Sequence, residues 1–170
     1  AMTDLNAAEQ RTLQTFLIIA YRTGLRPGEV AKLQMRDLEP SETGWLFVRE
    51  NRFGHNKTDA ALRKVPLFPL LTDVEKAIVN KHVQTRRISS APLTSLLLCA
   101  ENNSYEPLDT TQIALMTQAI LKDLSGGHYY RLYHLRHSAL SRLQLIMHHE
   151  LLTKEPNANW ISILTPYSVD

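Results

Sequence analysis

Three basic side chains stand where the sequence predicts chain reversals, and each has the chemistry to contact an anion. Arg26 follows Gly24, which should end one helix, and precedes Pro27, which should begin the next. Its guanidinium can project into a cleft beside exposed backbone N–H groups, with Glu29 one turn further on to hold it by a bidentate pair. Read alone, the segment fits a surface arginine beside a helix cap equally well.

The second position is Lys57, in a turn between two predicted strands. A lysine at a hairpin tip can reach a phosphate or a leaving oxygen that enters from outside, and its ammonium can donate a proton. Taken singly, an exposed loop lysine is more often simply solvated.

The third position is the start of a helix expected near His134. Tyr133 and Arg136 are three residues apart and His137 is four from Tyr133, so the three side chains share one helix face. An arginine, a histidine and a phenol at a helix N-terminus form an anion site, because the N–H groups of a helix end favour phosphate. The alternative is a core histidine with neighbouring surface arginines.

The composition allows a nucleic-acid partner without requiring one. The chain has 170 residues, 44% of them apolar, and a net charge of +2, which fits one globular domain. The segment 49–64 carries an excess of basic residues, Arg49, Arg52, Lys57, Arg63 and Lys64, over Glu50 and Asp59. A solvated charged face explains that excess as well.

The sequence lacks the features that several other classes of function require. The lone Cys99 excludes an internal disulfide, and no apolar run reaches the length of a membrane span. The start of the chain lacks the features of a signal peptide. The run 148–150, His-His-Glu, places its two histidines on different helix faces, so no metal site is expected. There is no glycine-rich loop for nucleotide phosphates.

The elements that would position these side chains follow from apolar periodicity and capping residues. Helices are expected at about 7–23, 27–34, 72–88 and 110–124, with another starting near 134; their candidate N-caps are Thr3 or Asn6, Thr72 or Asp73, and Asp109 or Thr110. Strands are expected at 45–48 and 61–67, and the apolar stretch 93–100 fits a strand or a helix. Inward-facing residues should include Val74, Ala77, Ile78 and Val83 in the third helix, and Ile113, Met116, Ala119 and Ile120 in the fourth. The fold class is therefore mainly α with a small antiparallel β-sheet (α+β).

Three motifs in this order resemble those of the tyrosine recombinases, the phage-integrase family. The segment 24–37, Gly-Leu-Arg-x-x-Glu-x-x-x-Leu-x-x-x-Asp, is similar to the first arginine box of that family. Lys-Thr at 57–58, followed by Val-Pro-Leu at 65–67, is similar to its β-hairpin lysine. Leu-Arg-His-Ser at 135–138 resembles its second box. The resemblance covers roughly residues 5–149.

The resemblance implies an integrase-like catalytic domain, over residues 3–149, that cuts and rejoins duplex DNA in site-specific recombination. A tyrosine would attack the phosphodiester, form a 3′-phosphotyrosyl link and free a 5′-hydroxyl. By similarity, Arg26 and Arg136 would neutralise the charge on the non-bridging oxygens, and Lys57 would protonate the leaving oxygen. Glu29 and His137 would support them. No cofactor is expected.

The partners that the resemblance implies are double-stranded DNA and other recombinase protomers on that DNA. Arg52, Arg63 and Arg131 are the expected additional DNA contacts, and the expected location is the bacterial cytoplasm or nucleoid, with no membrane contact.

Two positions depart from the family pattern. Tyr133 stands where the second box has its first histidine, and a phenol donates a hydrogen bond to phosphate but is a poor base at neutral pH. Tyr167 lies 31 residues beyond Arg136, yet Pro166 would interrupt a helix there. We therefore expect the nucleophile beyond Asp170, with residues 150–170 forming a tail or the start of an insert.

Two other classes of function remain open from the sequence. One is a non-catalytic DNA-binding or assembly module derived from a recombinase, which keeps the arginines as phosphate clamps. The other is a helical protein-interaction domain, for which salt-sensitive DNA binding is not expected.

Overall fold

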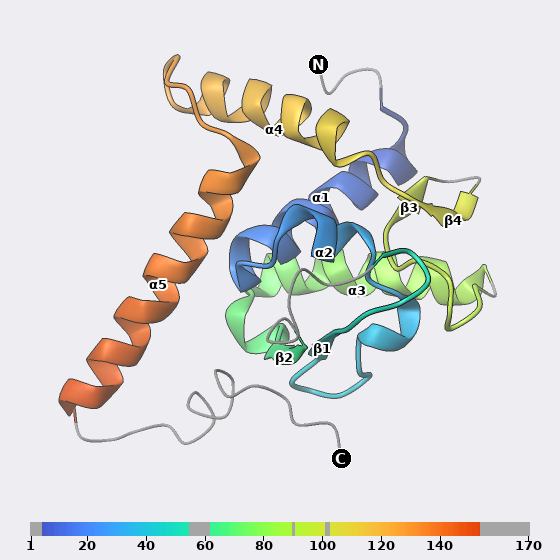
Figure 1. Ribbon diagram of the computed structural model, residues 1–170, viewed down its shortest axis with the longest axis horizontal. Helices are drawn as coiled ribbons and strands as arrows, with labels where there is room; N and C mark the ends of the chain where they lie inside the picture. Colours follow the sequence, from blue (N-terminus) through green and yellow to red (C-terminus); the bar gives the residue numbers. More distant parts are fainter. Residues whose placement is uncertain (1–4, 55–61, 90, 101–102, 154–170) are drawn as a thin grey trace.

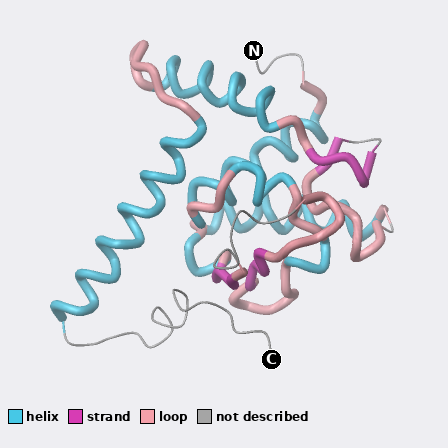
Figure 2. Tube along the Cα trace, viewed as in Figure 1, coloured by secondary structure: helices cyan, strands magenta, loops and turns pink. Residues whose placement is uncertain are grey.

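Helices dominate the architecture, and two short antiparallel sheets flank them (Figures 1 and 2). The computed structural model describes residues 5–54, 62–89, 91–100 and 103–153. The order is α1 (Ala7–Thr23), α2 (Pro27–Ala31), β1 (Trp45–Val48), β2 (Arg63–Pro66), α3 (Asp73–Ile88), β3 (Cys99–Ala100), β4 (Asn103–Pro107), α4 (Thr110–Leu124) and α5 (Leu132–Thr153). The predicted fold class is confirmed. No helix within these ranges has both the length and the apolar character needed to span a bilayer.

Helix α1 is the centre of the core, and its two ends are set by local sequence. Asn6 accepts hydrogen bonds from the backbone N–H groups of Ala8 and Glu9, which forms a capping box with Glu9. Gly24 ends the helix in the left-handed conformation, at φ +67°. The prediction of a helix over 7–23 is confirmed, and Asn6 is the cap.

Helix α2 ends earlier than predicted. It stops at Ala31 rather than Gln34, because Gln34 forms an antiparallel bridge with Leu96 and donates its backbone N–H to Asp37 (2.8 Å). The 3₁₀ turn Met35–Asp37 follows. A tertiary contact thus overrides the local helical preference.

Strands β1 and β2 form the predicted antiparallel pair, with Trp45 opposite Pro66 and Val48 opposite Arg63. The predicted return strand 61–67 is shorter in the structure, and Ala61 lies outside the described residues. A second pair, β3 with β4, was missed by the sequence reading. Within 93–100 the backbone is mostly irregular, and Leu96, Leu97 and Leu98 are fully buried.

Gly44, just before β1, is predicted to be the glycine least tolerant of substitution. Its φ is +57°, and a Cβ at this position would lie 2.6 Å from Cδ2 of Phe68. Left-handed strain and overpacking together should make Gly44→Ala destabilising by about 3 kcal/mol. Urea unfolding followed by circular dichroism measures the loss. Gly28→Ala is the control, because nothing lies within 4 Å of its Cβ and its φ is not positive; equal losses in both variants would contradict this account.

Helix α3 is capped by Thr72 as predicted, but its buried face differs from the predicted one. Val74 is 72% exposed and Ala77 is also exposed, so placing them inward was wrong. The buried residues are Val79, His82 and Val83. In the first turn of α3 the contact with α1 is an ion pair between Glu75 and Arg22, and the buried apolar face begins further along the helix, at Val79.

His82 should make the protein less stable in mild acid. Its ring is 4% exposed, and Nε2 lies 2.8 Å from the Leu97 carbonyl oxygen. Burial lowers the pKa of His82 below its ordinary value of 6.5. The unfolded chain therefore binds the proton first, and stability should fall as the pH drops below about 6.5, with a slope approaching about 1.4 kcal/mol per pH unit.

Urea unfolding at a series of pH values tests this, with His82→Gln as the variant. Glutamine keeps an amide N–H for Leu97 but does not titrate, so its stability should be flat between about pH 6.5 and 5. An unchanged slope in His82→Gln would show that another group causes the loss.

Helices α4 and α5 form a second, outer layer (Figure 1). Asp109 caps α4 by accepting from the N–H groups of Thr111 and Gln112. Ile113 and Thr117 are buried in α4, whereas Ala119 is exposed, against the prediction. Helix α5 begins at Leu132, two residues before the predicted start, and packs against α1.

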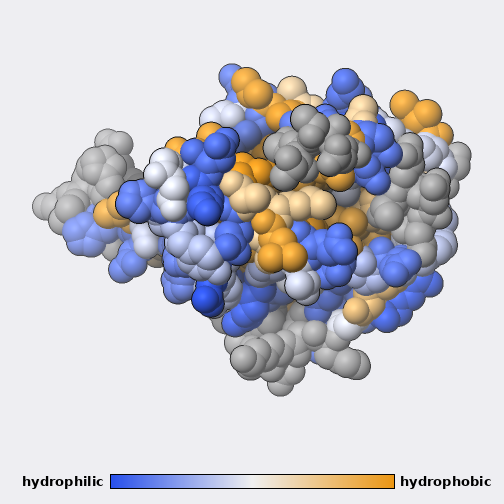
Figure 3. Space-filling view, turned by 90° about the horizontal axis from the view of Figure 1, so that it is seen from above, coloured by the Kyte–Doolittle hydropathy of each residue, from blue (hydrophilic) through white to orange (hydrophobic). Residues whose placement is uncertain are grey.

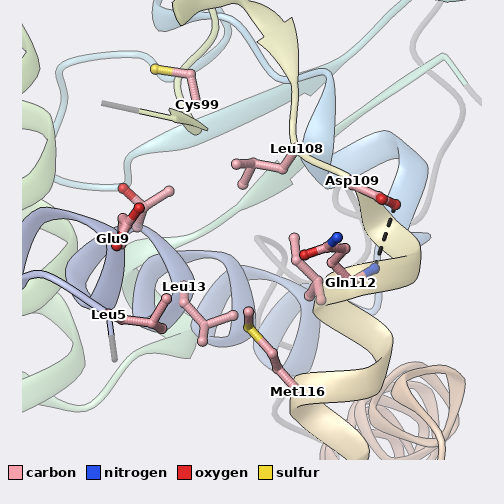
Figure 4. A pocket seen from close by; sticks show the side chains of 10 residues that line it. Leu5, Glu9, Leu13, Cys99, Leu108, Asp109, Gln112 and Met116 are labelled. Atoms are coloured by element: carbon pink, nitrogen blue, oxygen red, sulfur yellow. Dashed lines mark hydrogen bonds between the residues drawn. The ribbon is translucent and has the colours of Figure 1, made fainter. Parts of the chain in front are cut away.

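The contact between α1 and α4 leaves a mainly apolar pocket of about 260 Å³, with Leu5, Leu13, Leu108 and Met116 in its walls (Figure 4). Apolar side chains also gather among hydrophilic ones on the face shown in Figure 3. The side chains of α1 and α4 therefore do not fill the space between the two helices completely.

Candidate active site

The turn between α1 and α2 holds Arg26 in an extended conformation, with φ −66° and ψ 145°. Its backbone N–H donates to Oε2 of Glu29 (2.7 Å), and its Nη1 donates to Oε1 of the same carboxylate (3.2 Å). The side chain of Arg26 is 40% exposed, so the guanidinium is fixed from behind and open to solvent in front. The predicted Arg26–Glu29 pair is present, but it is not bidentate through the guanidinium, because the second carboxylate oxygen accepts from the Arg26 backbone.

Glu29 is the anchor of this arrangement, since its side chain is only 7% exposed. Arg63, from β2, donates to both carboxylate oxygens of Glu29, at 2.9 Å and 3.3 Å. Burial raises the pKa of Glu29, but the hydrogen bonds from Arg63 and from the Arg26 backbone, with the charges of both arginines, outweigh it and lower the pKa. Glu29 is therefore a carboxylate at neutral pH, shared by two cations.

Arg136 reaches the same turn from the opposite end of the sequence. Its Nη1 donates to the carbonyl oxygen of Gly24, 112 residues away along the chain. Helix α5 approaches the turn closely, because a Cβ on Gly24 would lie 3.3 Å from Leu140 and 3.4 Å from Ala139. Gly24 thus serves twice, as the left-handed helix end and as the surface against which α5 packs. The fold brings Arg26 and Arg136 to one turn.

Tyr133 and His137 lie on the same face of α5, as predicted from their spacing. Their rings meet edge to face with centroids 4.9 Å apart, and Tyr133 is 48% exposed. His134 has a different role, because its Nδ1 accepts the backbone N–H of Arg131 (2.8 Å) and so caps the start of α5. Both side chains are exposed, but His134 is held by the backbone of Arg131, whereas Tyr133 precedes Arg136 by three residues on the helix.

The remaining predicted DNA contacts are exposed arginines braced by aromatic rings. Arg52 lies 4.8 Å from the ring centroid of Phe53 and 4.5 Å from that of Tyr105. Arg131 lies 5.6 Å from the ring of Tyr129. Stacking fixes the guanidinium plane while its N–H edges stay available to phosphates.

Two predicted positions fall outside the described residues, namely Lys57 and Tyr167. Their roles stay predictions. Among the described residues, no group of three or more histidine, cysteine, aspartate or glutamate side chains could hold a metal ion.

Sequence reading missed three structural roles near the site. Arg63, for which a DNA contact stays a prediction, is the second partner of Glu29. Lys32 is buried, its Nζ donates to the Gly54 carbonyl (3.2 Å), and burial lowers its pKa. Arg142 of α5 donates to the carbonyls of Tyr21 and Arg22 at the end of α1. The sequence indicates a special environment for Lys32, because this lysine interrupts an apolar run. The partners of Arg63 and Arg142 could not be predicted, because they are distant in the sequence.

Comparison with known proteins places this geometry in a recognised fold. No protein-family model matches the sequence, and no curated protein matches it. Among solved structures, the fold matches that of an integrase, with a TM-score of 0.54 and 18% sequence identity. That structure is the Tn1549 transposon integrase (residues 82–397, Y379F) in complex with transposon right end DNA.

The match covers 100% of this chain and 62% of the integrase chain, so this chain spans less than two thirds of that structure. The Tn1549 integrase is a tyrosine recombinase. The resemblance inferred from the three motifs is therefore confirmed by an independent comparison of structure, at the level of the fold.

Proposed function

We propose that this chain belongs to an enzyme that cuts and rejoins duplex DNA through a phosphotyrosyl intermediate. The observation that supports it best is the meeting of Arg26 and Arg136 at one turn, in a fold shared with a DNA-bound integrase. Both guanidinium groups are held from behind, by Glu29 and by the Gly24 carbonyl, which leaves N–H donors for an anion.

The proposed reaction is an exchange of one phosphoester for another. A tyrosine hydroxyl of the intact protein attacks the phosphorus, its proton leaves to solvent, and the bond from phosphorus to the 5′-oxygen breaks. Lys57 gives a proton to that leaving oxygen. Arg26 and Arg136 stabilise the charge on the two non-bridging oxygens of the transition state. The ester energy stays in the phosphotyrosyl bond, and the reverse steps rejoin DNA without nucleotide hydrolysis.

Tyr133 and His137 have a supporting role in this proposal. The exposed phenol of Tyr133 donates a hydrogen bond to a phosphate oxygen and is fixed by the edge of the His137 ring. The phenol acts here as a hydrogen-bond donor and not as a base.

Covalent capture on nicked duplex DNA tests the proposal. The nick lets a short fragment diffuse away after cleavage, so the phosphotyrosyl adduct accumulates and survives denaturation. The intact protein should form the adduct, and an Arg87→Gln variant, altered at an exposed residue of α3, should form it equally well. Salt-sensitive DNA binding without any adduct would favour a non-catalytic DNA-binding module, and no DNA binding would contradict the proposal.

A further inference from the structure

A second basic pocket lies between α1 and α3, well away from the turn that holds Arg26. It has a volume of about 130 Å³ and is lined by Arg11 on one side and by His82 and Arg86 on the other, with Thr85, Ser89 and Cys99 completing the wall. Arg11 lies twelve residues before the end of α1, which corresponds to about 18 Å along the helix axis. The proposed cleavage site does not use this pocket.

Arg86 is held rigidly in the wall of the pocket. Its Nη2 donates to the Leu96 carbonyl (2.9 Å) and its Nη1 to Oγ of Ser104 (3.3 Å). Its Nε is buried and has no hydrogen-bond partner among the described residues. A buried donor without a partner costs about 1–3 kcal/mol, and more when it is charged. Arg86 therefore lines the pocket as a cation whose Nε has no acceptor among the described residues.

The charges around the pocket have the same sign. Arg86 and Arg11 both act on the buried ring of His82, and their charges add to burial in lowering its pKa. None of the described lining residues is acidic. The hydroxyls of Thr85 and Ser89 donate within the helix, to the carbonyls of Lys81 and Thr85. The charged donors that line the pocket are the guanidinium groups of Arg11 and Arg86. Converging guanidinium groups are the usual protein partners of oxyanions.

We propose that this pocket binds one phosphate group, held by Arg11 and Arg86. Its volume is well below the ~300–1,000 Å³ of pockets that hold drug-sized ligands, which favours a small tetrahedral anion over a whole nucleotide. The same chemistry is offered by a DNA backbone phosphate and by free inorganic phosphate.

Calorimetric titration with inorganic phosphate, at constant ionic strength set with chloride, tests the pocket directly. The main variant is Arg11→Gln, because Arg86→Gln would also free the Leu96 carbonyl and so risks unfolding the 95–98 segment. Arg87→Gln, at an exposed neighbour outside the lining, is the control. We expect saturable binding to the wild type and the control, and about tenfold weaker binding to Arg11→Gln. No saturable binding, or equal affinity in all three, would overturn the proposal.

Duplex binding against salt concentration then identifies the source of the phosphate. If a backbone phosphate fills the pocket, Arg11→Gln should lower the slope of log K against log salt by about one, and Arg87→Gln should not. An unchanged slope together with lost phosphate binding assigns the pocket to the free ion. Covalent adduct formation at the Arg26 turn does not depend on this pocket, so failure here leaves the proposed cleavage chemistry standing.

Discussion

Replacing Arg136 by glutamine is expected to slow strand cleavage by about 10²- to 10³-fold, the usual cost of removing one charged donor from a transition state. The expectation follows from its place beside the Gly24 carbonyl, at the turn that also holds Arg26. Single-turnover cleavage of nicked duplex DNA measures the rate. Binding of the same duplex should change only a few-fold, because one phosphate contact among many is lost.

Two comparisons separate this effect from damage to the fold. Arg26→Gln should show a similar loss of rate, because both arginines serve one phosphate. Arg142→Gln also removes an arginine of α5, one that donates to the backbone carbonyls of Tyr21 and Arg22 at the end of α1. It should therefore cost stability and leave most of the cleavage rate. Wild-type cleavage by both Arg26→Gln and Arg136→Gln would show that the site is wrongly assigned.

Replacing Glu29 by glutamine should have the second largest effect, since it removes the carboxylate that Arg26 and Arg63 share. Hydrogen bonds to a charged group contribute about 1.5–3 kcal/mol, and we expect a loss of about 2 kcal/mol in the free energy of unfolding, given that Arg26 is partly exposed. Cleavage should fall by about tenfold or more, because Arg26 is no longer held in position. Urea unfolding and single-turnover cleavage measure the two effects.

The pH dependence gives this prediction a second readout. Because the pKa of Glu29 is lowered in the folded protein, its stabilising effect is present above the ordinary value of 4.5 and is lost as the pH falls through the folded value. The stability difference between wild type and Glu29→Gln should therefore shrink in acid below about pH 4.5.

Glu75→Gln is the matched control for Glu29→Gln. Glu75 also binds one arginine, Arg22 (2.9 Å), and caps a helix, and its pKa is lowered too, but its partner is Arg22 of α1 and not Arg26. Glu75→Gln should lower the free energy of unfolding. Its cleavage rate should fall no further than the loss of folded protein explains. Equal slowing in both variants would mean that Glu29 acts only through stability.

The parts of the fold that sequence predicts well are those with local causes. The bounds of α1 follow from Asn6 and Gly24, because a side-chain cap and a left-handed residue act within one turn of the helix they limit. The Arg26–Glu29 pair is local for the same reason, because the partners are three positions apart in the sequence. The start of α3 at Thr72 belongs to this group as well.

The parts that sequence could not predict depend on distant contacts. Helix α2 ends early because Gln34 pairs with Leu96, and no local pattern contains that pairing. The role of Arg63 depends on the register of β1 and β2, which brings it to a carboxylate 34 residues away. The contact of Arg136 with Gly24 requires α5 to pack on the end of α1, so the motifs predict that the two arginines act together but not how they are held.

The most direct test of the two-arginine clamp compares cleavage of two nicked duplexes that differ only at the scissile phosphate. One carries the ordinary phosphodiester and the other an uncharged methylphosphonate, which replaces one non-bridging oxygen by a methyl group. If Arg136 neutralises charge on that phosphate, Arg136→Gln should be about 10²- to 10³-fold slower than wild type on the ordinary duplex and within about tenfold of it on the methylphosphonate. An equally large deficit on both duplexes would contradict the clamp.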